Sequence, residues 1–327
     1  MDRQPTIYSI ARELGIHPST VSRAFSRPDL VRPEMRERVL QKAEDLGYTP
    51  NAVARGLITG KTGMVGLLIP DIENPFFPPA IHAIQSALAA HDLAVMLINS
   101  DLAHNAEGAL IQRVRSQLDG LVLMSSRADP AALVQAARGL PLVLVNVVAD
   151  GSFSVTIDSD TALLEAVAYL RRLGHTEFVL LRGPAASWLA QQRRQRISEW
   201  ATSVDVRLLE LGPYEAGFED GLTAARDLAT LSATAVLAFD DVMAAGVLAG
   251  LTKLGVRVPT DVSIVGCDDV LLAKMTAPAL TTVAAPFEDV GKTVAQGLWE
   301  QISGGPPPES VRLRGHLVIR DSTGRRN

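Results

Sequence analysis

The chain has 327 residues, a formal net charge of −5 at pH 7 and 47% hydrophobic residues. This length exceeds that of one small domain and allows two large lobes, each with a core of its own. No charged start precedes an apolar segment, and no uninterrupted apolar run of about 18 residues follows. Neither secretion nor a membrane span is therefore indicated, and we expect a cytoplasmic protein.

Cysteine and histidine give no indication of a metal site. Cys267 is the only cysteine, which excludes an internal disulfide and a thiolate zinc cluster, and it is expected in the core. The six histidines are scattered without the close spacing of metal ligands. We therefore expect neither a metal nor another cofactor.

Residues 6–26, TIYSIARELGIHPSTVSRAFS, predict two short helices around a tight turn at Gly15. The apolar positions recur at helical spacing in both halves: Ile7, Ile10, Ala11 and Leu14, then Val21, Ala24 and Phe25. This pattern is typical of a helix-turn-helix.

A third helix is needed because two helices of this length cannot form a core alone. Pro33 suits its first position and Gly47 follows its last. Its apolar residues, expected to cover the other two helices, are Val39, Leu40, Ala43 and Leu46.

The second helix is predicted to read DNA, because a helix fits the major groove and its first turns meet base edges. Pro18 begins it, His17 is the expected cap, and Arg23 can bond a guanine in a bidentate way. The alternative, a merely solvated polar helix, fits less well because the stripes, turn and arginine agree. The expected DNA contacts of the head are Thr6, Tyr8, Pro18, Ser19, Thr20, Ser22, Arg23, Ser26 and Arg32.

Charge is divided unevenly along the chain. Residues 1–61 hold ten Lys or Arg against seven Asp or Glu and so have a net charge of +3. Because the whole chain has a net charge of −5, the remaining residues have a net charge of −8. A basic head on an acidic body suits DNA binding at one end only.

Residues 49–63, TPNAVARGLITGKTG, predict a short helix that is barely stable alone. Gly56 weakens it by roughly 1 kcal/mol relative to alanine, so it should fold only when covered. The segment ends like a phosphate-binding P-loop. However, the spacing from Gly56 to Gly60 is one residue short, and no strand precedes it.

Several motifs together resemble the lactose repressor (LacI/GalR) family. They are the helix-turn-helix, PNAVARGL at 50–57, GLLIPDIENPFF at 66–77, VSIVGCDD at 262–269, PALTTV at 278–283 and RDSTG at 320–324. The resemblance implies a homodimeric transcriptional regulator that acts as a repressor at a palindromic double-stranded DNA operator. Its hinge helices would pair in the minor groove, where Leu57 would wedge open the central step beside Asn51 and Ala54.

After residue 64, buried strands alternate with amphipathic helices in two series, and repeated βαβ units make parallel sheets. We expect an all-α helix-turn-helix domain plus an α/β body of two doubly wound parallel-sheet lobes, which the resemblance makes periplasmic-binding-protein-like. The expected divisions are 1–49 for the DNA-binding domain, 50–63 for the hinge, 64–158 with 288–315 for the N-terminal lobe, and 159–287 with 316–327 for the C-terminal lobe.

Polar residues at strand ends are the candidates for a small-ligand site in the cleft. Asp71, Asn146, Asp158, Asp240 and Asp268 each follow an expected strand. The resemblance implies that Phe77, Asp158, Arg193, Tyr214, Asp240 and Asp268 bind the effector. Alternatives remain: Asp158 and Asp268 as helix caps, Arg193 as part of a solvated run, and Phe77 and Tyr214 as core.

Two departures from the family pattern bear on the effector. Asp240 stands where asparagine is frequent, and Ala285 replaces a frequent glutamine. An extra carboxylate favours hydroxyl-rich or cationic ligands over anionic ones, so we expect a neutral sugar, sugar alcohol or nucleoside.

Two other classes of protein are less consistent with the sequence. A sugar receptor without DNA binding would leave the basic head without a role. A dehydrogenase or other enzyme would need a GxGxxG fingerprint or a set of nucleophile, base and orienting group, and neither is evident. We therefore expect no enzyme activity.

Overall fold

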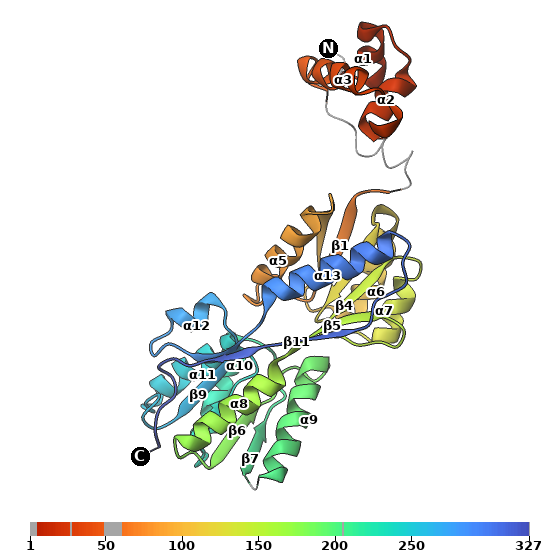
Figure 1. Cartoon of the computed structure of the whole chain (residues 1–327). Coiled ribbons are helices and arrows are strands. Elements are labelled where there is room, and N and C mark those ends of the chain that lie inside the picture. Colours follow the sequence, from red (N-terminus) through yellow and green to blue (C-terminus); the bar gives the residue numbers. More distant parts are fainter. Residues whose placement is uncertain (1–4, 27, 49–60, 205, 327) are drawn as a thin grey trace. The chain divides into compact units, whose positions relative to one another are not determined.

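The structure is a computed structural model that describes residues 5–26, 28–48, 61–204 and 206–326. It divides into two compact units, Met1–Gly63 and Met64–Asn327, called here the head and the body. Figure 1 shows the helices of the head and the two sheets of the body.

The head contains the predicted helix-turn-helix and third helix. Its helices are α1 (Ile7–Leu14), α2 (Pro18–Ser26) and α3 (Pro33–Asp45). Thr6 and Ser9 cap α1 reciprocally: the Ser9 amide donates to Thr6 Oγ1 at 3.3 Å, and the Thr6 amide donates to Ser9 Oγ at 2.7 Å. Gly15 then turns the chain with a φ of 65°, which glycine adopts without strain.

Two of the four expected core positions of α3 are wrong. Val39 and Ala43 are buried, but the side chains of Leu40 and Leu46 are 37% and 36% exposed. Met35 packs against the core instead. Positions 35, 39 and 43 follow a narrow stripe of period four, and Leu40 and Leu46 lie outside it.

The body contains two six-stranded sheets that follow the two predicted βαβ series. The first has the order β11-β5-β4-β3-β1-β2 and the second the order β12-β10-β9-β8-β6-β7. All pairings are parallel except that of β12 with β10, which is antiparallel. The strands are β1 (Met64–Ile69), β2 (Ala94–Asn99), β3 (Gly120–Met124), β4 (Leu142–Val145), β5 (Phe153–Asp158), β6 (Glu177–Leu181), β7 (Arg207–Leu211), β8 (Ala235–Leu237), β9 (Ser263–Asp268), β10 (Thr281–Ala284), β11 (Val311–Arg314) and β12 (His316–Val318).

Helices cover both faces of each sheet, as long apolar strands require. The helices of the first lobe are α5 (Phe77–Ala89) and α13 (Phe287–Ile302) on one face, with α6 (Glu107–Val114) and α7 (Pro130–Ala136) on the other. Those of the second lobe are α10 (Phe218–Leu228) and α11 (Asp241–Lys253) on one face, α8 (Ser159–Arg172) and α9 (Trp188–Ser203) on the other, and the short α12 (Leu271–Met275).

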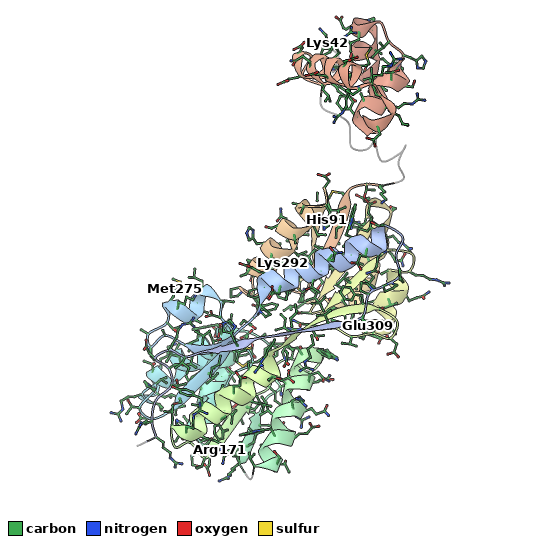
Figure 2. The ribbon with its side chains drawn as sticks, viewed as in Figure 1. Lys42, His91, Arg171, Met275, Lys292 and Glu309 are labelled. Carbon is green, nitrogen blue, oxygen red and sulfur yellow. The ribbon has the colours of Figure 1, made fainter. Side chains whose placement is uncertain are left out.

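The outward faces of these helices carry charged side chains, such as those of Arg171 and Lys292 (Figure 2). Of the helices that the structure describes, none is long and apolar enough to span a membrane.

The chain passes between the lobes three times, and the crossings converge at Gly315. They run from β5 to α8, from β10 to α13 and from β11 to β12. The Gly315 amide donates to the carbonyl of Asp158 at 3.1 Å. A Cβ on Gly315 would lie 2.8 Å from the carbonyl oxygen of Ala284, so only glycine fits where the crossings meet.

Candidate functional site

The head exposes most of the charged and aromatic side chains predicted to contact DNA. Tyr8 is 69% exposed, and Thr6, Arg23 and Arg32 are also exposed. Pro18, Ser19, Thr20 and Ser22 are half-buried at the start and middle of α2, and Ser26 ends that helix.

His17 lies at the start of α2, as expected for its cap. The Ser19 amide donates to His17 Nδ1 at 3.3 Å, and the Thr20 amide donates to the His17 carbonyl at 2.8 Å. These bonds occupy amides that the first turn of a helix leaves without an internal partner.

Arg23 and Arg32 line one shallow groove of the head. The groove has a volume of about 220 Å³ and is lined by Thr20, Arg23, Leu30, Val31, Arg32 and Met35. Arg32 precedes α3 without a side-chain capping bond, so its guanidinium is not used to start that helix. Asn51, Ala54 and Leu57 of the predicted hinge lie outside the described residues.

A cavity of about 280 Å³ lies between the two lobes of the body. The first lobe contributes Pro70, Asp71, Asn74, Phe76, Phe77, Leu102, Ser125, Arg127 and Asn146. The second contributes Pro184, Ser187, Leu189, Arg193, Glu215, Ala216, Gly217, Asp220, Phe239, Asp240 and Asp268. Most of these residues follow strands, because the carboxyl ends of both parallel sheets face this space.

Six of the eight predicted effector residues line the cavity: Asp71, Phe77, Asn146, Arg193, Asp240 and Asp268. Phe77 is 5% exposed and also belongs to the core of the first lobe. Phe77 therefore lies both in the core of the first lobe and at the wall of the cavity.

Arg193 is a buried cation rather than part of a solvated run, since it is only 3% exposed. Its Nε and Nη2 donate to Ser159 Oγ at 3.1 and 3.0 Å, and its Nη1 donates to the carbonyl of Phe239. The guanidinium carbon lies 5.0 Å from the centre of the Phe239 ring. That ring packs so closely on Gly183 that a Cβ there would lie 2.3 Å from it.

Two aspartates of the second lobe, Asp240 and Asp268, also line the cavity. Asp240 is the N-cap of α11 and accepts a hydrogen bond from the Met243 amide at 2.7 Å. Burial raises its pKa, although that bond and Arg193 oppose the rise. Burial also raises the pKa of Asp268 well above its usual value, and the negative charge of Asp240 adds to the effect.

Asn146 offers the cavity an amide group that the protein leaves partly unused. Its Oδ1 accepts from the Ile157 amide at 2.9 Å, which holds the side chain in place. Among the described residues, its Nδ2 has no hydrogen-bond partner although it is buried. A buried donor without a partner is costly, so a ligand acceptor at this point would be stabilising.

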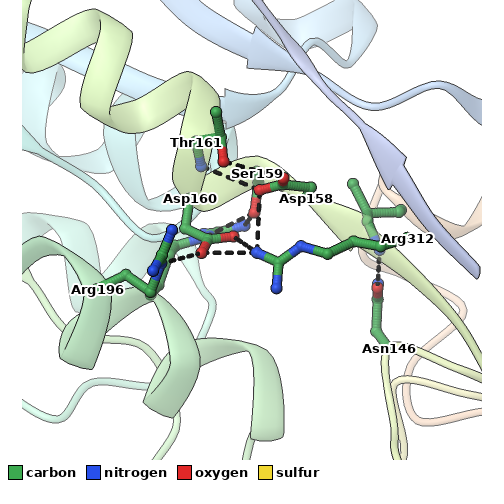
Figure 3. Close-up of polar contacts among 9 residues, drawn as sticks. Asn146, Asp158, Ser159, Asp160, Thr161, Arg196 and Arg312 are labelled. Atoms are coloured by element: carbon green, nitrogen blue, oxygen red, sulfur yellow. Dashed lines mark hydrogen bonds and ion pairs between the residues drawn. The ribbon is translucent and has the colours of Figure 1, made fainter.

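Asp158 and Tyr214 do not line the cavity, contrary to expectation. Asp158 is the N-cap of α8: its oxygens accept from the amide and hydroxyl of Thr161 at 3.0 and 2.9 Å, and Arg312 Nη2 lies 3.1 Å away (Figure 3). Asp158 thus caps α8, as one of its two interpretations predicted. Tyr214 packs on the core of the second lobe and donates its hydroxyl to Asp227 Oδ2 at 2.7 Å.

Sequence reasoning missed several lining residues, among them Ser125, Arg127, Glu215, Asp220 and Phe239. Ser125 and Arg127 follow β3, so the strand-end argument applied to every strand would have found them. Ser125, Asn146 and Asp268 also share a positive φ, at 52°, 54° and 110°. A positive φ is unfavourable for these residue types and often occurs at functional sites. The sequence alone does not predict it at these positions.

Comparisons with known proteins agree with this architecture. Residues 6–51 match the model of bacterial regulatory proteins of the lacI family, and residues 167–323 match a periplasmic binding protein-like domain. Catabolite control protein A of Priestia megaterium is 31% identical, with 97% of this chain and 99% of that one covered. The HTH-type transcriptional repressor CytR of Escherichia coli (strain K12) is 32% identical, with 97% and 96% covered.

Two solved structures show the same fold over nearly the whole chain. The lac repressor dimer bound to operator and the anti-inducer ONPF has a TM-score of 0.86 at 24% identity, covering 98% of this chain and 100% of that one. The complex of the regulator CelR with cellobiose has a TM-score of 0.71 at 27% identity, covering 97% and 99%.

A helix-turn-helix head joined to a body with an interlobe cavity defines a ligand-controlled transcriptional regulator. The chain belongs to the lacI family of bacterial regulatory proteins. The predicted family, fold class and general function are thereby confirmed.

Proposed function

We propose that this regulator is a cytoplasmic homodimer that represses genes at a palindromic operator, and that an uncharged, hydroxyl-rich ligand in the cavity controls its affinity for DNA. In this proposal residues 1–49 bind the operator, residues 50–63 form the hinge, and the body from residue 64 binds the ligand. A closing or opening of the lobes that changes the hinge would couple the two sites by roughly 1–3 kcal/mol.

The observation that carries the ligand class is the polarity of the cavity wall. The unpartnered Asn146 Nδ2 needs an acceptor, and the carboxyl groups of Asp240 and Asp268 line the same cavity and can bond to a hydroxyl group. A hydroxyl group is both donor and acceptor, so a polyol can satisfy all three. Phe76 and Phe77 offer apolar surface to the carbon face of a sugar ring.

Charge argues against an anionic ligand. The lining contains five carboxylates, those of Asp71, Glu215, Asp220, Asp240 and Asp268, against the two guanidinium groups of Arg127 and Arg193. Both arginines already bond to protein groups: Arg127 to Glu215, and Arg193 to Ser159 and Phe239. A phosphate or carboxylate would therefore meet the carboxylates of Asp71 and Asp220 without a free cation to compensate. The CelR complex with cellobiose, a neutral sugar, supports the same class.

Thermal unfolding of the full chain with matched ligands tests this proposal. Neutral sugars, sugar alcohols and nucleosides would be compared with sugar phosphates and aldonates at equal concentration. We expect a rise in Tm only for members of the uncharged group, because a ligand stabilises the state that binds it. A rise confined to the anionic group would contradict the proposal.

A matched pair of variants then locates the site. Asn146→Asp keeps the oxygen that accepts from Ile157 but removes the Nδ2 donor, so it should abolish the Tm rise given by the active ligand. Ser154→Ala is the control, because Ser154 Oγ is also buried without a partner among the described residues but lies away from the cavity. Equal loss in both variants would place the ligand elsewhere.

Operator binding is tested by selecting fragments of genomic DNA on the full chain and measuring them by gel shift. The groove that joins Thr20, Arg23 and Arg32 supports α2 as the reading element. Adding the active ligand to the same gels shows whether it releases or promotes binding. Absence of a specific complex in both conditions would exclude operator control.

Sedimentation of the free chain at micromolar concentration tests the proposed homodimer and should show a dimer.

A further inference from the structure

Two polar contacts join the lobes across the cavity, away from the three crossings. Arg127, which follows β3 of the first lobe, is ion-paired with Glu215, which follows β7 of the second. Asn74, which follows β1 of the first lobe, donates from Nδ2 to Asp240 Oδ2 of the second at 3.3 Å. All four residues line the cavity.

The two contacts lie at opposite depths. The side chain of Glu215 is 60% exposed, whereas Asp240 is 3% exposed. The ion pair therefore lies at the solvent end of the cavity and the amide contact at its buried end. Arg127, with its side chain 12% exposed, extends from the wall of the first lobe to the surface carboxylate.

Hydrogen bonds within each lobe hold Asn74, Asp240 and Glu215 in position independently of the contacts between the lobes. Asn74 Oδ1 accepts from the Phe76 amide at 2.9 Å, which fixes the turn after β1. Asp240 Oδ1 is bonded to the Met243 amide at the start of α11. The Glu215 carbonyl accepts from the Gly217 amide at 2.9 Å, within a tight turn before α10. Forming the contacts therefore needs little further ordering of these turns.

We infer that Arg127 and Glu215 form a latch that holds the two lobes together over the cavity independently of any ligand. A ligand enters only when this ion pair and the Asn74–Asp240 contact separate. The latch thus sets the fraction of molecules that are open to ligand, whatever the chemistry of that ligand. The latch acts in the same way whether or not the ligand is a sugar.

Hydrogen exchange of the full chain without ligand, read by mass spectrometry, tests the latch. Arg127→Gln and Glu215→Gln should each raise the exchange rate about 2–5-fold, the range expected for a partly exposed ion pair. The rise should occur at residues 125–130 and 213–217 and also at the separate loop of residues 71–77, because opening the lobes exposes all three. At 1 M NaCl the wild-type protein should approach the variants, since salt screens the pair.

Arg207→Gln is the matched control. Arg207 pairs with Glu177 at 2.8 Å within the second lobe, so its loss removes the same charge without joining or separating the lobes. It should leave the exchange of residues 71–77 unchanged.

The exchanged pair, Arg127→Glu with Glu215→Arg, separates a latch from a local defect. Restoring opposite charges across the cavity should return exchange toward the wild-type rate, whereas either reversal alone should raise it. The inference is overturned if the single variants leave exchange unchanged, if their effect is confined to the two mutated loops, or if the exchanged pair stays as open as the single variants. Because no ligand is present, these outcomes do not depend on the proposed effector class.

Discussion

Arg193 and Ser159 join the wall of the ligand cavity to the first crossing between the lobes. The Nε and Nη2 atoms of Arg193 both donate to Ser159 Oγ, at 3.1 and 3.0 Å. One turn further along α9, Arg196 Nε lies 3.2 Å from Asp160 Oδ2 beside the same crossing (Figure 3). One helix therefore presents one arginine to the cavity and another to the crossing.

Replacing Arg193 with glutamine should destabilise the body as well as the site. The bonds to Ser159 and to the Phe239 carbonyl would be lost, and the buried positive charge near Asp240 would disappear. We expect the free energy of unfolding in urea to fall by about 1–3 kcal/mol, because buried groups lose their partners. The Tm rise given by an active ligand should also vanish.

Arg194→Gln is the control on the same helix. The side chain of Arg194 is 54% exposed and pairs with Glu210 at 2.6 Å, so its loss should cost less than about 1 kcal/mol. An equal loss of stability in both variants would show that the buried bonds of Arg193 contribute no more than a surface ion pair does.

Arg312 should make the stability of the body depend on acid pH. It bonds to Asp158 at 3.1 Å and to Asp160 at 2.6 and 2.7 Å (Figure 3). Burial by itself would raise the pKa of Asp158, but the hydrogen bonds from Arg312 and Thr161 outweigh it and hold that pKa well below its usual value.

The folded pKa of Asp158 is thus lower than the unfolded value of about 3.9. Its contribution to stability is present above that value and is lost as pH falls through the folded pKa. Urea unfolding of Arg312→Gln should therefore show a smaller loss of stability between pH 5 and pH 3 than the wild-type protein. Arg196→Gln, which leaves the Arg312–Asp158 bond in place, should keep the wild-type loss, and identical acid profiles in all three proteins would contradict this role.

The fold was largely predictable because its signals are local and repeated. Apolar runs such as LVLM at 121–124 have the length of buried parallel strands, and Pro33 and Gly47 mark the ends of one helix. The failure at Leu40 and Leu46 has a physical cause: a three-helix head buries a narrow stripe, so apolar residues beside it stay exposed.

The site was less predictable, because similar strand ends differ in which side chains reach the cavity. Asp158 ends β5 as Asp268 ends β9, yet Asp158 is bonded to Thr161 and Arg312 while Asp268 lines the cavity. Arg127 and Glu215 are 88 residues apart in sequence, and neither belongs to a motif. Only the relative placement of the two sheets brings them together.

Asp241 should make the folded protein less stable as pH rises, which is the opposite of the effect of Asp158. Burial raises its pKa to about 7, although Thr282 donates to its Oδ1 at 2.6 Å and the Val270 amide to its Oδ2 at 3.0 Å. Between the unfolded value of about 3.9 and this pKa, the folded state binds more protons, so stability falls as pH rises through that window.

Asp241→Asn replaces the titrating carboxyl with an amide that has no pKa in this range. The amide oxygen can still accept from the Val270 amide, and the amide nitrogen can donate to the Thr282 hydroxyl. Relative to the wild-type protein, the variant should be more stable at pH 8 than at pH 5 by about 1–3 kcal/mol in urea unfolding. Asp261→Asn is the control: Arg257 lowers the pKa of Asp261 to about 2, so its effect should be the same at pH 5 and pH 8. A pH-independent difference for Asp241→Asn would show that this carboxylate is charged throughout.

The same substitution at two glycines should have opposite effects on stability. A Cβ on Gly246 of α11 would lie 2.1 Å from the Phe218 carbonyl oxygen and 2.9 Å from Gly221 Cα, where α10 and α11 pack backbone to backbone. Gly246→Ala should therefore cost about 1–3 kcal/mol through overpacking. Gly108→Ala on α6 meets only Ala136 Cβ, at 4.0 Å, and should stabilise by up to about 1 kcal/mol. Thermal unfolding of the two variants gives the signs, and a stabilised Gly246→Ala would mean that the helices can separate freely.

Arg23 should carry much of the sequence discrimination of the head. Its side chain is exposed on α2, whereas Pro18 and Ser19 at the start of that helix offer a methylene surface and one hydroxyl. A bidentate contact of arginine with guanine is worth roughly 1–3 kcal/mol, so Arg23→Ala should weaken binding to the selected operator about 5–150-fold. Binding to unrelated DNA should fall much less, because it depends on phosphate contacts.

Arg12→Ala, which removes an exposed arginine of α1, is the charge-matched control in the same gel-shift titration. Equal losses for both variants on both DNAs would mean that Arg23 contacts phosphate and that another residue reads the bases.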